Sequence, residues 1–149
     1  MSNVHATCVA FGKQGVLIRG ASGAGKSTLA LQLIDAQGFG LGKTELRAQL
    51  VSDDQTLLRI SKGQLIASAP VALAGLIELR GLGIVAVAYK KSVTIKLLVD
   101  LCAPDQIERW PAQKDLTDVI EGIRCPRILI GINNPAAPAL VRAALHHFV

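Results

Sequence analysis

Gly20-Ala21-Ser22-Gly23-Ala24-Gly25-Lys26-Ser27 fits the phosphate-loop pattern G-x-x-x-x-G-K-[ST] at every fixed position and follows an apolar stretch at residues 16–18. Glycines let backbone N–H groups turn inward around a phosphate, because glycine reaches positive φ without a Cβ clash. Residues 28–34 place apolar side chains at helical spacing. The stretch therefore predicts a loop between a strand and a helix N-terminus, where the helix dipole favours anions.

This motif predicts binding of a nucleoside triphosphate such as ATP. Lys26 is expected on the β- and γ-phosphates, and the Ser27 hydroxyl is placed to hold Mg²⁺. The predicted nucleotide-binding residues are Gly20, Ala21, Ser22, Gly23, Ala24, Gly25, Lys26, Ser27 and Thr28. A glycine-rich turn that binds nothing is the alternative, and the register of strand, loop and helix argues against it.

Composition indicates one soluble domain over residues 1–149. Half of the residues are hydrophobic, but charges, glycines or prolines interrupt each long apolar stretch well before the roughly 18 residues of a membrane span. Residues 1–5 lack the basic region and apolar core of a secretory signal, which together with the ATP-type motif favours the cytoplasm. Cys8, Cys102 and Cys125 lie far apart without a C-x-x-C pair, so we expect buried free thiols and no zinc site.

The net charge of +5 indicates little about partners by itself. The Lys and Arg residues are scattered, and the chain has only three Phe, one Trp and one Tyr, so nucleic-acid binding is not predicted. A basic surface also suits nucleotide phosphates or an acidic protein partner, and simple solubility is the alternative.

The rest of the chain reads mainly as strands. Residues 37–44 resemble a second phosphate loop, but Gln37 replaces the first glycine and the segment follows the helix, so we interpret it as a flexible connector. Strands are expected at residues 5–11, 16–18, 50–52, 56–60, 64–67, 76–79, 84–87, 93–99 and 127–130, and a second helix at about 138–147. So many strands with two helices favour a mixed α/β sheet over a plain alternating α/β fold.

Asp53 and Asp54 end a short apolar strand after the phosphate-loop helix. Nucleotide-binding folds place a carboxylate there, near the metal or the attacking group. One acid is expected to take a proton from an attacking hydroxyl while the other helps to hold the metal or orients the first, because successive strand residues face opposite ways. A solvated turn is the alternative interpretation.

Three further residues are candidates, and two of them, Glu78 and Arg109, have two interpretations each. Glu78 lies inside an apolar run, and its partner is either Mg²⁺ or Arg80. Arg109 either stabilises charge on a transferring phosphoryl group or stacks on Trp110. His5, taken alone, has the character of a surface residue.

Together, His5, the phosphate loop, residues 51–54 and the segment Ile77-Glu78-Leu79-Arg80-Gly81-Leu82-Gly83-Ile84 resemble the catalytic domain of the HPr kinase/phosphorylase family. The Glu-x-Arg-Gly-Leu-Gly segment is distinctive of that family, and the resemblance spans nearly the whole chain. It implies an Mg-ATP-dependent serine protein kinase that phosphorylates the phosphocarrier HPr of the sugar phosphotransferase system. It also implies a homo-oligomer, a hexamer, with the α/β fold of phosphoenolpyruvate carboxykinases: a phosphate-loop-containing mixed sheet with flanking helices.

The resemblance also implies roles for matching positions. Asp53 would take the proton from the substrate serine and return it in the reverse reaction, with Asp54 beside it. His5 would lie near the attacking group, and Lys26 would bind the γ-phosphate. The implied catalytic residues are His5, Lys26, Asp53, Asp54 and Arg109, and the implied Mg²⁺ ligands are Ser27 and Glu78.

The chain departs from the family pattern in three places. The separate N-terminal domain of full-length members is absent, so a short form built from the catalytic domain is expected. Residues 38–47 form a longer connector than usual, which predicts a shifted Asp53 or a mobile flap. Residues 131–135, Gly-Ile-Asn-Asn-Pro, replace the Arg-rich segment used for dephosphorylation, so kinase activity is expected and phosphorylase activity is doubtful. A non-catalytic ATP-binding regulatory module and a small-metabolite kinase stay open as alternatives.

Overall fold

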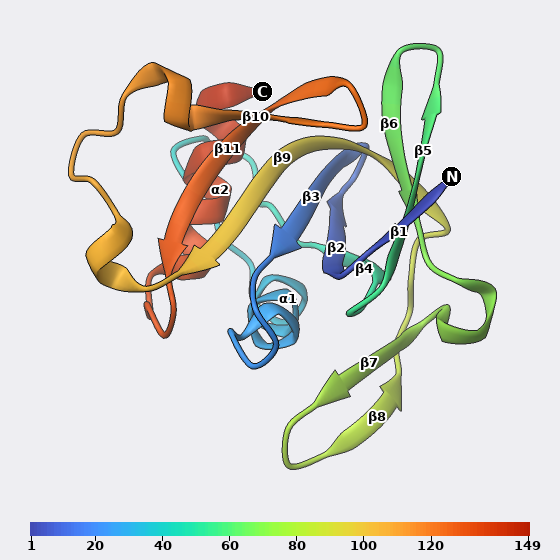
Figure 1. Cartoon of the computed structure of the whole chain (residues 1–149). Coiled ribbons are helices and arrows are strands. Elements are labelled where there is room, and N and C mark those ends of the chain that lie inside the picture. The colour runs from blue at the N-terminus through green and yellow to red at the C-terminus, as the bar shows by residue number, and fades with distance from the viewer.

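The long strand β9 (Ser92–Cys102) is the spine of a nine-stranded mixed sheet in the computed structural model, which describes residues 1–149. β3 (Gln14–Arg19) runs parallel to β9 along one edge. Along its other edge β9 pairs first with β6 (Gln64–Ser68), antiparallel, and then with β11 (Ile123–Gly131), parallel. The three strands β3, β9 and β11 run in the same direction, so their C-terminal ends lie at the same end of the sheet (Figure 1).

The other strands extend this sheet by antiparallel pairing. They are β2 (Ala6–Phe11) on β3, β4 (Gln49–Ser52) on β2, β5 (Thr56–Ser61) on β6, β1 (Ser2–Val4) on β5, and β10 (Thr117–Ile120) on β11. A separate hairpin of β7 (Leu76–Leu79) and β8 (Gly83–Ala86) projects from the body of the molecule (Figure 1). Short 3₁₀ turns lie at η1 (Val71–Leu73), η2 (Pro104–Gln106) and η3 (Gln113–Leu116).

Two helices, α1 (Lys26–Asp35) and α2 (Ala137–Phe148), pack on one face of the sheet. A cluster of 19 buried hydrophobic residues lies between them and the sheet, and a second cluster of 12 fills the opposite, curled face. Strand alternation divides the residues between the clusters: Val16 and Ile18 belong to the first and Leu17 to the second. A β-bulge opposite Gly15 and Val16 shifts this alternation in β9.

The predicted strands and both helices are present, with ends that differ by a few residues. β1 (Ser-Asn-Val) and β10 (Thr-Asp-Val-Ile) were not predicted, because both are short and begin with two polar residues. Cys8 and Cys125 are buried free thiols, whereas Cys102 is only partly buried, which corrects the expectation for that residue. Neither helix has the length and apolar content needed to cross a membrane.

The connector between α1 and β4 packs on α2 and does not project as a flap. The buried guanidinium of Arg142 in α2 donates hydrogen bonds to the carbonyls of Ala36 (2.5 Å), Leu46 (2.8 Å) and Leu33 (3.4 Å). Burial lowers the pKa of Arg142. A buried charged group needs such partners, so this side chain joins the end of α1, the connector and α2.

We expect Gly40→Ala to reduce the free energy of unfolding by about 3 kcal/mol. Gly40 has φ 60°, and a Cβ there would lie 2.7 Å from the backbone C and O of Arg142. The left-handed backbone costs about 1 kcal/mol for alanine, and forced overlap adds roughly 1–3 kcal/mol. Urea unfolding measures the loss. Gly63→Ala is the matched control, because Gly63 has φ 73° with open space around it and should lose only about 1 kcal/mol. Equal losses for the two variants would contradict the close packing of the connector.

Candidate active site

The phosphate loop lies where the sequence predicts, between β3 and α1. Gly23 and Gly25 have φ values of 81° and 100°, which glycine adopts without strain, and Gly25 caps the N-terminus of α1. Gly20 is needed for a different reason, since a Cβ there would lie 3.2 Å from the Cβ atoms of Ala24 and Leu101. The loop is therefore a tight turn that ends at the N-terminus of α1, where backbone N–H groups favour an anion.

Lys26 is folded into this loop. Its side chain is buried, and Nζ donates to the carbonyl oxygens of Gly20 (3.0 Å) and Ala21 (3.1 Å). These contacts compensate for the burial of an ammonium group. A lysine ammonium has three N–H donors, so one remains for a further acceptor such as a phosphate oxygen.

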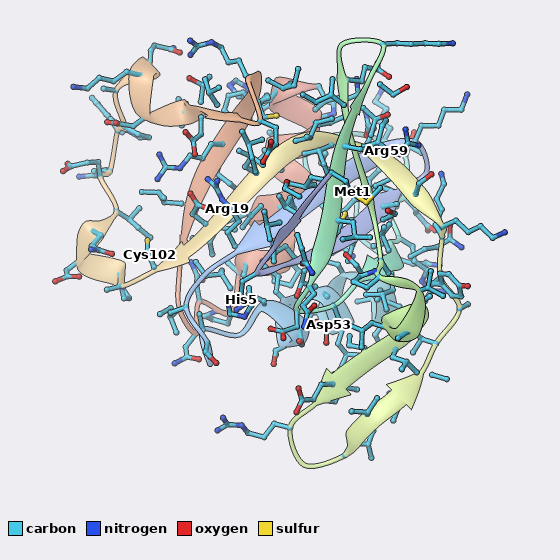
Figure 2. The ribbon with its side chains drawn as sticks, turned by 45° about the vertical axis from the view of Figure 1, so that its right-hand side comes forward. Met1, His5, Arg19, Asp53, Arg59 and Cys102 are labelled. Atoms are coloured by element: carbon cyan, nitrogen blue, oxygen red, sulfur yellow. The ribbon has the colours of Figure 1, made fainter.

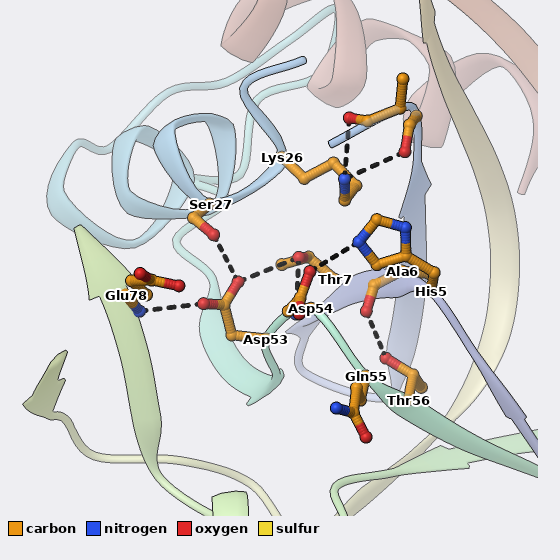
Figure 3. A network of polar contacts seen from close by, with 12 residues as sticks. His5, Ala6, Thr7, Lys26, Ser27, Asp53, Asp54, Gln55, Thr56 and Glu78 are labelled. Atoms are coloured by element: carbon orange, nitrogen blue, oxygen red, sulfur yellow. Dashed lines mark hydrogen bonds and ion pairs between the residues drawn. The ribbon is translucent and has the colours of Figure 1, made fainter. Parts of the chain in front are cut away.

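Asp53 is the polar centre of the site (Figure 3). Only 6% of the residue is exposed. Its Oδ1 accepts hydrogen bonds from Ser27 Oγ (2.6 Å) and Thr7 Oγ1 (3.0 Å), and its Oδ2 accepts from the backbone N–H of Glu78 (2.9 Å). The carboxylate thus joins the phosphate-loop helix, β2 and β7, and these three donors hold it in one orientation.

Asp54 points away from this cluster toward solvent and pairs with His5. His5 Nε2 and Asp54 Oδ1 are 2.7 Å apart, and both side chains are about half exposed. Figure 2 shows His5 and Asp53 close together at the α1 end of the sheet. Asp54 has φ 65°, in the left-handed region, and its N–H donates to Thr7 Oγ1 at 3.1 Å. The two consecutive acids therefore serve two sides of the site, one buried and one open. They follow the end of β4, and the left-handed turn at Asp54 separates them in place of the strand alternation that we expected.

Thr7 was not singled out from the sequence, although it contacts both acids. Its hydroxyl donates to Asp53 and accepts from the Asp54 N–H, so one side chain fixes the turn that separates them. The available signal was weak: a hydroxyl residue in an otherwise apolar strand, two residues after His5.

Thr7→Val is expected to lower the free energy of unfolding by about 2 kcal/mol. Valine has nearly the same shape but leaves the Asp54 N–H without its acceptor and removes one donor from buried Asp53, and each unsatisfied group costs roughly 1–3 kcal/mol. Thermal and urea unfolding measure the change. Thr7→Ser keeps the hydroxyl and should lose about 1 kcal/mol or less, from one buried methyl group. A Val variant as stable as the wild type would show that the hydroxyl does not hold the two acids.

The remaining predicted residues are placed differently. Glu78 lies in β7 beside Asp53, where its backbone makes the contact and its side chain is exposed (Figure 3). It forms no ion pair with Arg80, which was one of the two interpretations. Arg109 is exposed in the excursion between β9 and β10 and makes no side-chain hydrogen bond or ion pair. The structure does not bring Arg109 to the cluster around Asp53.

A second polar network supports the start of the loop. Arg19 directly precedes Gly20 and donates to both oxygens of Asp100 (2.6 and 2.9 Å) and to Asp118 (2.9 Å). Arg127 Nε donates to Asp100 as well, at 2.7 Å. The hydrogen bond from Arg19 lowers the pKa of the Asp118 carboxyl. Sequence reasoning missed this network, which joins β3, β9, β10 and β11.

The oxygen donors at the centre of the site fit Mg²⁺. Ser27 Oγ and the Asp53 carboxylate lie together at the helix N-terminus, and Mg²⁺ prefers oxygen ligands. The chain has no cluster of three or more His, Cys, Asp or Glu side chains that would form a complete cage. Mg²⁺ is usually held by one or two carboxylates together with phosphate oxygens and water, so the arrangement suits an ion shared with a nucleotide.

A glycine-rich loop between a strand and a helix, with its lysine folded inside and its serine bonded to a buried acid, defines the phosphate-loop class of α/β proteins. Comparison with known proteins narrows the class. The family model "HPr Serine kinase C-terminal domain" matches residues 1–148, and the chain belongs to this family.

Similar proteins agree with this family. The HPr kinase/phosphorylase of Bordetella petrii is 34% identical over 129 residues, which cover 79% of this chain and 38% of that protein. The HPr kinase/phosphorylase of Leptothrix cholodnii is 31% identical over 148 residues, which cover 91% of this chain and 42% of that protein. The chain thus spans about two fifths of the length of these relatives. The structure of the Hpr(Ser) kinase/phosphatase from Coxiella burnetii matches with a TM-score of 0.77 and 32% identity, covering 99% of this chain and 95% of that one. The predicted mixed α/β fold and family are confirmed.

Proposed function

We propose that this protein is an Mg-ATP-dependent kinase that phosphorylates a serine of an HPr-type phosphocarrier protein in the cytoplasm. One observation carries the proposal: consecutive acids face two sides of one site. Buried Asp53 contacts Ser27 of the phosphate loop, while Asp54 opens to solvent with His5. A nucleotide side and an acceptor side therefore meet at adjacent residues. The names of the relatives support the substrate class.

On the nucleotide side, the phosphate loop would bind the triphosphate and the free donor of Lys26 would contact the γ-phosphate. Ser27 and Asp53 would hold Mg²⁺. Glu78, whose backbone N–H contacts Asp53 and whose side chain is exposed, would be the further ligand. When bound, the ion neutralises charge on the β- and γ-phosphates.

On the acceptor side, the contacts favour Asp54 as the group that takes the serine proton. The sequence-based assignment gave this role to Asp53, but three donors already occupy the Asp53 oxygens and its carboxylate is buried. Asp54 is about half exposed, so a serine hydroxyl on a protein surface can reach it, and His5 orients its carboxylate. The assignment of Arg109 remains a prediction, since it requires the 103–116 excursion to approach the site.

A three-arm assay separates this proposal from its alternatives. The purified chain is incubated with γ-labelled Mg-ATP and an HPr-type carrier, the same carrier with its acceptor serine replaced by alanine, or a protein-free cell extract. Label on the first carrier alone supports the proposal. Carrier and ATP binding without any transfer would favour a regulatory module, and label only on a small molecule would favour a metabolite kinase.

The oligomer and the reverse reaction belong to the same proposal. A homo-oligomer, a hexamer by family resemblance, would show six times the chain mass in light scattering, and a monomer would contradict it.

The single-domain interpretation of residues 1–149 predicts one cooperative unfolding transition. Phosphate-driven removal of label from the carrier is not expected, because residues 131–135 lack the Arg-rich pattern.

A further inference from the structure

The excursion between β9 and β10, residues 103–116, is attached to the rest of the protein mainly at its two ends. It projects from the body of the molecule (Figure 1), and its residues 103–115 are all exposed. No side chain in it forms an ion pair or a hydrogen bond, and the hydrogen bonds of its turns, Gln106 N–H to Ala103 and Asp115 N–H to Ala112, are internal. A cavity of about 660 Å³ lies between it, β11 and α2. Because few contacts hold the excursion along its length, its position depends on how its ends are fixed.

Arg19 binds both ends of this excursion. Asp100 lies in β9 just before the excursion begins, and Asp118 lies in β10 just after it ends. The Arg19 guanidinium donates to both oxygens of Asp100, at 2.6 and 2.9 Å, and to Asp118 at 2.9 Å. Only 26% of its side chain is exposed, so these charge-assisted bonds are partly shielded from water. One side chain on β3 therefore fixes the two ends of the excursion relative to the same point.

The residue that follows Arg19 is the first residue of the phosphate loop, Gly20. Its carbonyl accepts a hydrogen bond from Lys26 Nζ at 3.0 Å. A Cβ on Gly20 would lie 3.2 Å from the Leu101 Cβ, so the loop begins in close contact with the end of β9. A phosphate oxygen that binds the free donor of Lys26 would thus act one residue away from Arg19. Continuous contacts of this kind can carry coupling from the loop to the ends of the excursion.

We propose that Arg19 is a positioning residue of the proposed kinase, and that it couples nucleotide binding at the phosphate loop to the position of the 103–116 excursion. The excursion contains Arg109, whose predicted role requires it to approach the site. Arg19 sets this approach when the loop is occupied, and so places Arg109 on the transferring phosphoryl group. The inference rests on the proposed function, because it takes Mg-ATP to bind at the loop.

Trp110 reports directly on the excursion, because it is the only tryptophan of the chain, lies within 103–116 and is 88% exposed. Titration with Mg-ATP should move its fluorescence emission to shorter wavelength and reduce its quenching by acrylamide, as the excursion approaches the loop. Arg19→Met should abolish both changes, because methionine replaces the arginine stem but bonds neither acid. Its Mg-ATP affinity, measured by calorimetry, should fall by no more than about tenfold, since coupling between two sites is reciprocal and typically of this size.

Two further variants separate coupling from a purely structural role. Arg127→Met is the matched control, because it removes the other arginine bonded to Asp100, at 2.7 Å, and leaves the Arg19 bonds in place. It should keep the response of Trp110 to Mg-ATP. Asp118→Asn weakens only the bond at the far end of the excursion and should lose part of the response. Loss of the response in Arg127→Met as complete as in Arg19→Met would show that the network only stabilises the fold, and would overturn the proposal.

Single-turnover transfer to the carrier at saturating Mg-ATP tests the link to Arg109. Arg19→Met should slow this transfer by about 10- to 100-fold, the loss expected when a reacting group is misplaced. In an Arg109→Ala background the same substitution should cost less than about twofold, because the effects of residues that act through one another are not additive. Equal losses in the two backgrounds would overturn the action of Arg19 through Arg109.

Urea unfolding first establishes that each variant is folded under the assay conditions. An unchanged Trp110 response in Arg19→Met, or a wild type that binds Mg-ATP without any response, would overturn the coupling while leaving the proposed kinase intact. Failure of the wild type to bind Mg-ATP would instead overturn the proposed function on which the inference rests.

Discussion

Lys26→Ala is expected to lower the rate of phosphoryl transfer to the carrier by about 10²–10³-fold, the usual effect of removing one donor that stabilises transition-state charge. Lys26 is buried in the loop and has one N–H donor beyond those bonded to Gly20 and Ala21. The substitution removes the positive charge that would lie closest to the γ-phosphate. Initial rates with γ-labelled ATP measure the effect.

Lys13→Ala is the control for this experiment. Lys13 is an exposed residue in the turn between β2 and β3, and its loss changes the net charge equally without touching the phosphate loop. The control should transfer phosphate at the wild-type rate. A Lys26→Ala variant within a few-fold of that rate would show that the loop does not hold the reacting phosphate.

Asp54→Asn is expected to lower transfer by about 10²–10⁴-fold while leaving Mg-ATP affinity unchanged, because general-base catalysis contributes that much and Asp54 does not contact the phosphate loop. Asp53→Asn should act differently. Asparagine replaces one carboxylate oxygen by an NH₂ group, which then lies opposite a group that now donates to Asp53: Ser27, Thr7 or the Glu78 N–H. The site is disturbed, so Mg-ATP affinity should fall as well.

Titrations with Mg-ATP and single-turnover rates separate the two variants. Both proteins should first be compared by urea unfolding, because Asp53 is buried and its substitution also removes stabilising contacts. Wild-type transfer by Asp54→Asn, with loss confined to Asp53→Asn, would return the proton-accepting role to Asp53.

The phosphate loop could be predicted because its signal is local. Glycine positions, the preceding strand and the following helix all lie within about twenty consecutive residues, and the structure places each of them as expected. The pairing of Ser27 with Asp53 was predictable only as a general feature of nucleotide-binding folds. Its geometry depends on β4 lying beside β2, which is a pairing between distant segments.

Contacts between distant strands explain what the sequence did not reveal. Thr7 acts on Asp53 across 46 residues, and Arg19 acts on Asp100 across 81. Both depend on the pairing and register of strands around β9, which includes a bulge opposite Gly15 and Val16. The spacing of residues along one strand does not determine its register with a distant strand. After a bulge, the alternation of apolar and polar residues assigns side chains to the wrong face of the sheet.

The resemblance assigns Arg109 to the active site, whereas in the structure the excursion that contains it follows the end of β9 and its side chain is exposed. The role of Arg109 stays a prediction. The connector was interpreted as flexible because it follows the helix, and a mobile flap was one expectation because it is longer than usual in the family. Gly38, Gly40 and Gly42 instead allow close approach to Arg142 and His146 of α2.

The most direct test of the central claim is the position of phosphate on the carrier after incubation with this chain and Mg-ATP, determined by mass spectrometry. The account predicts one phosphoserine on an HPr-type carrier, formed by wild type and Lys13→Ala and missing with Lys26→Ala. An unmodified carrier, from a chain that is shown in the same sample to bind Mg-ATP and the carrier, would contradict it.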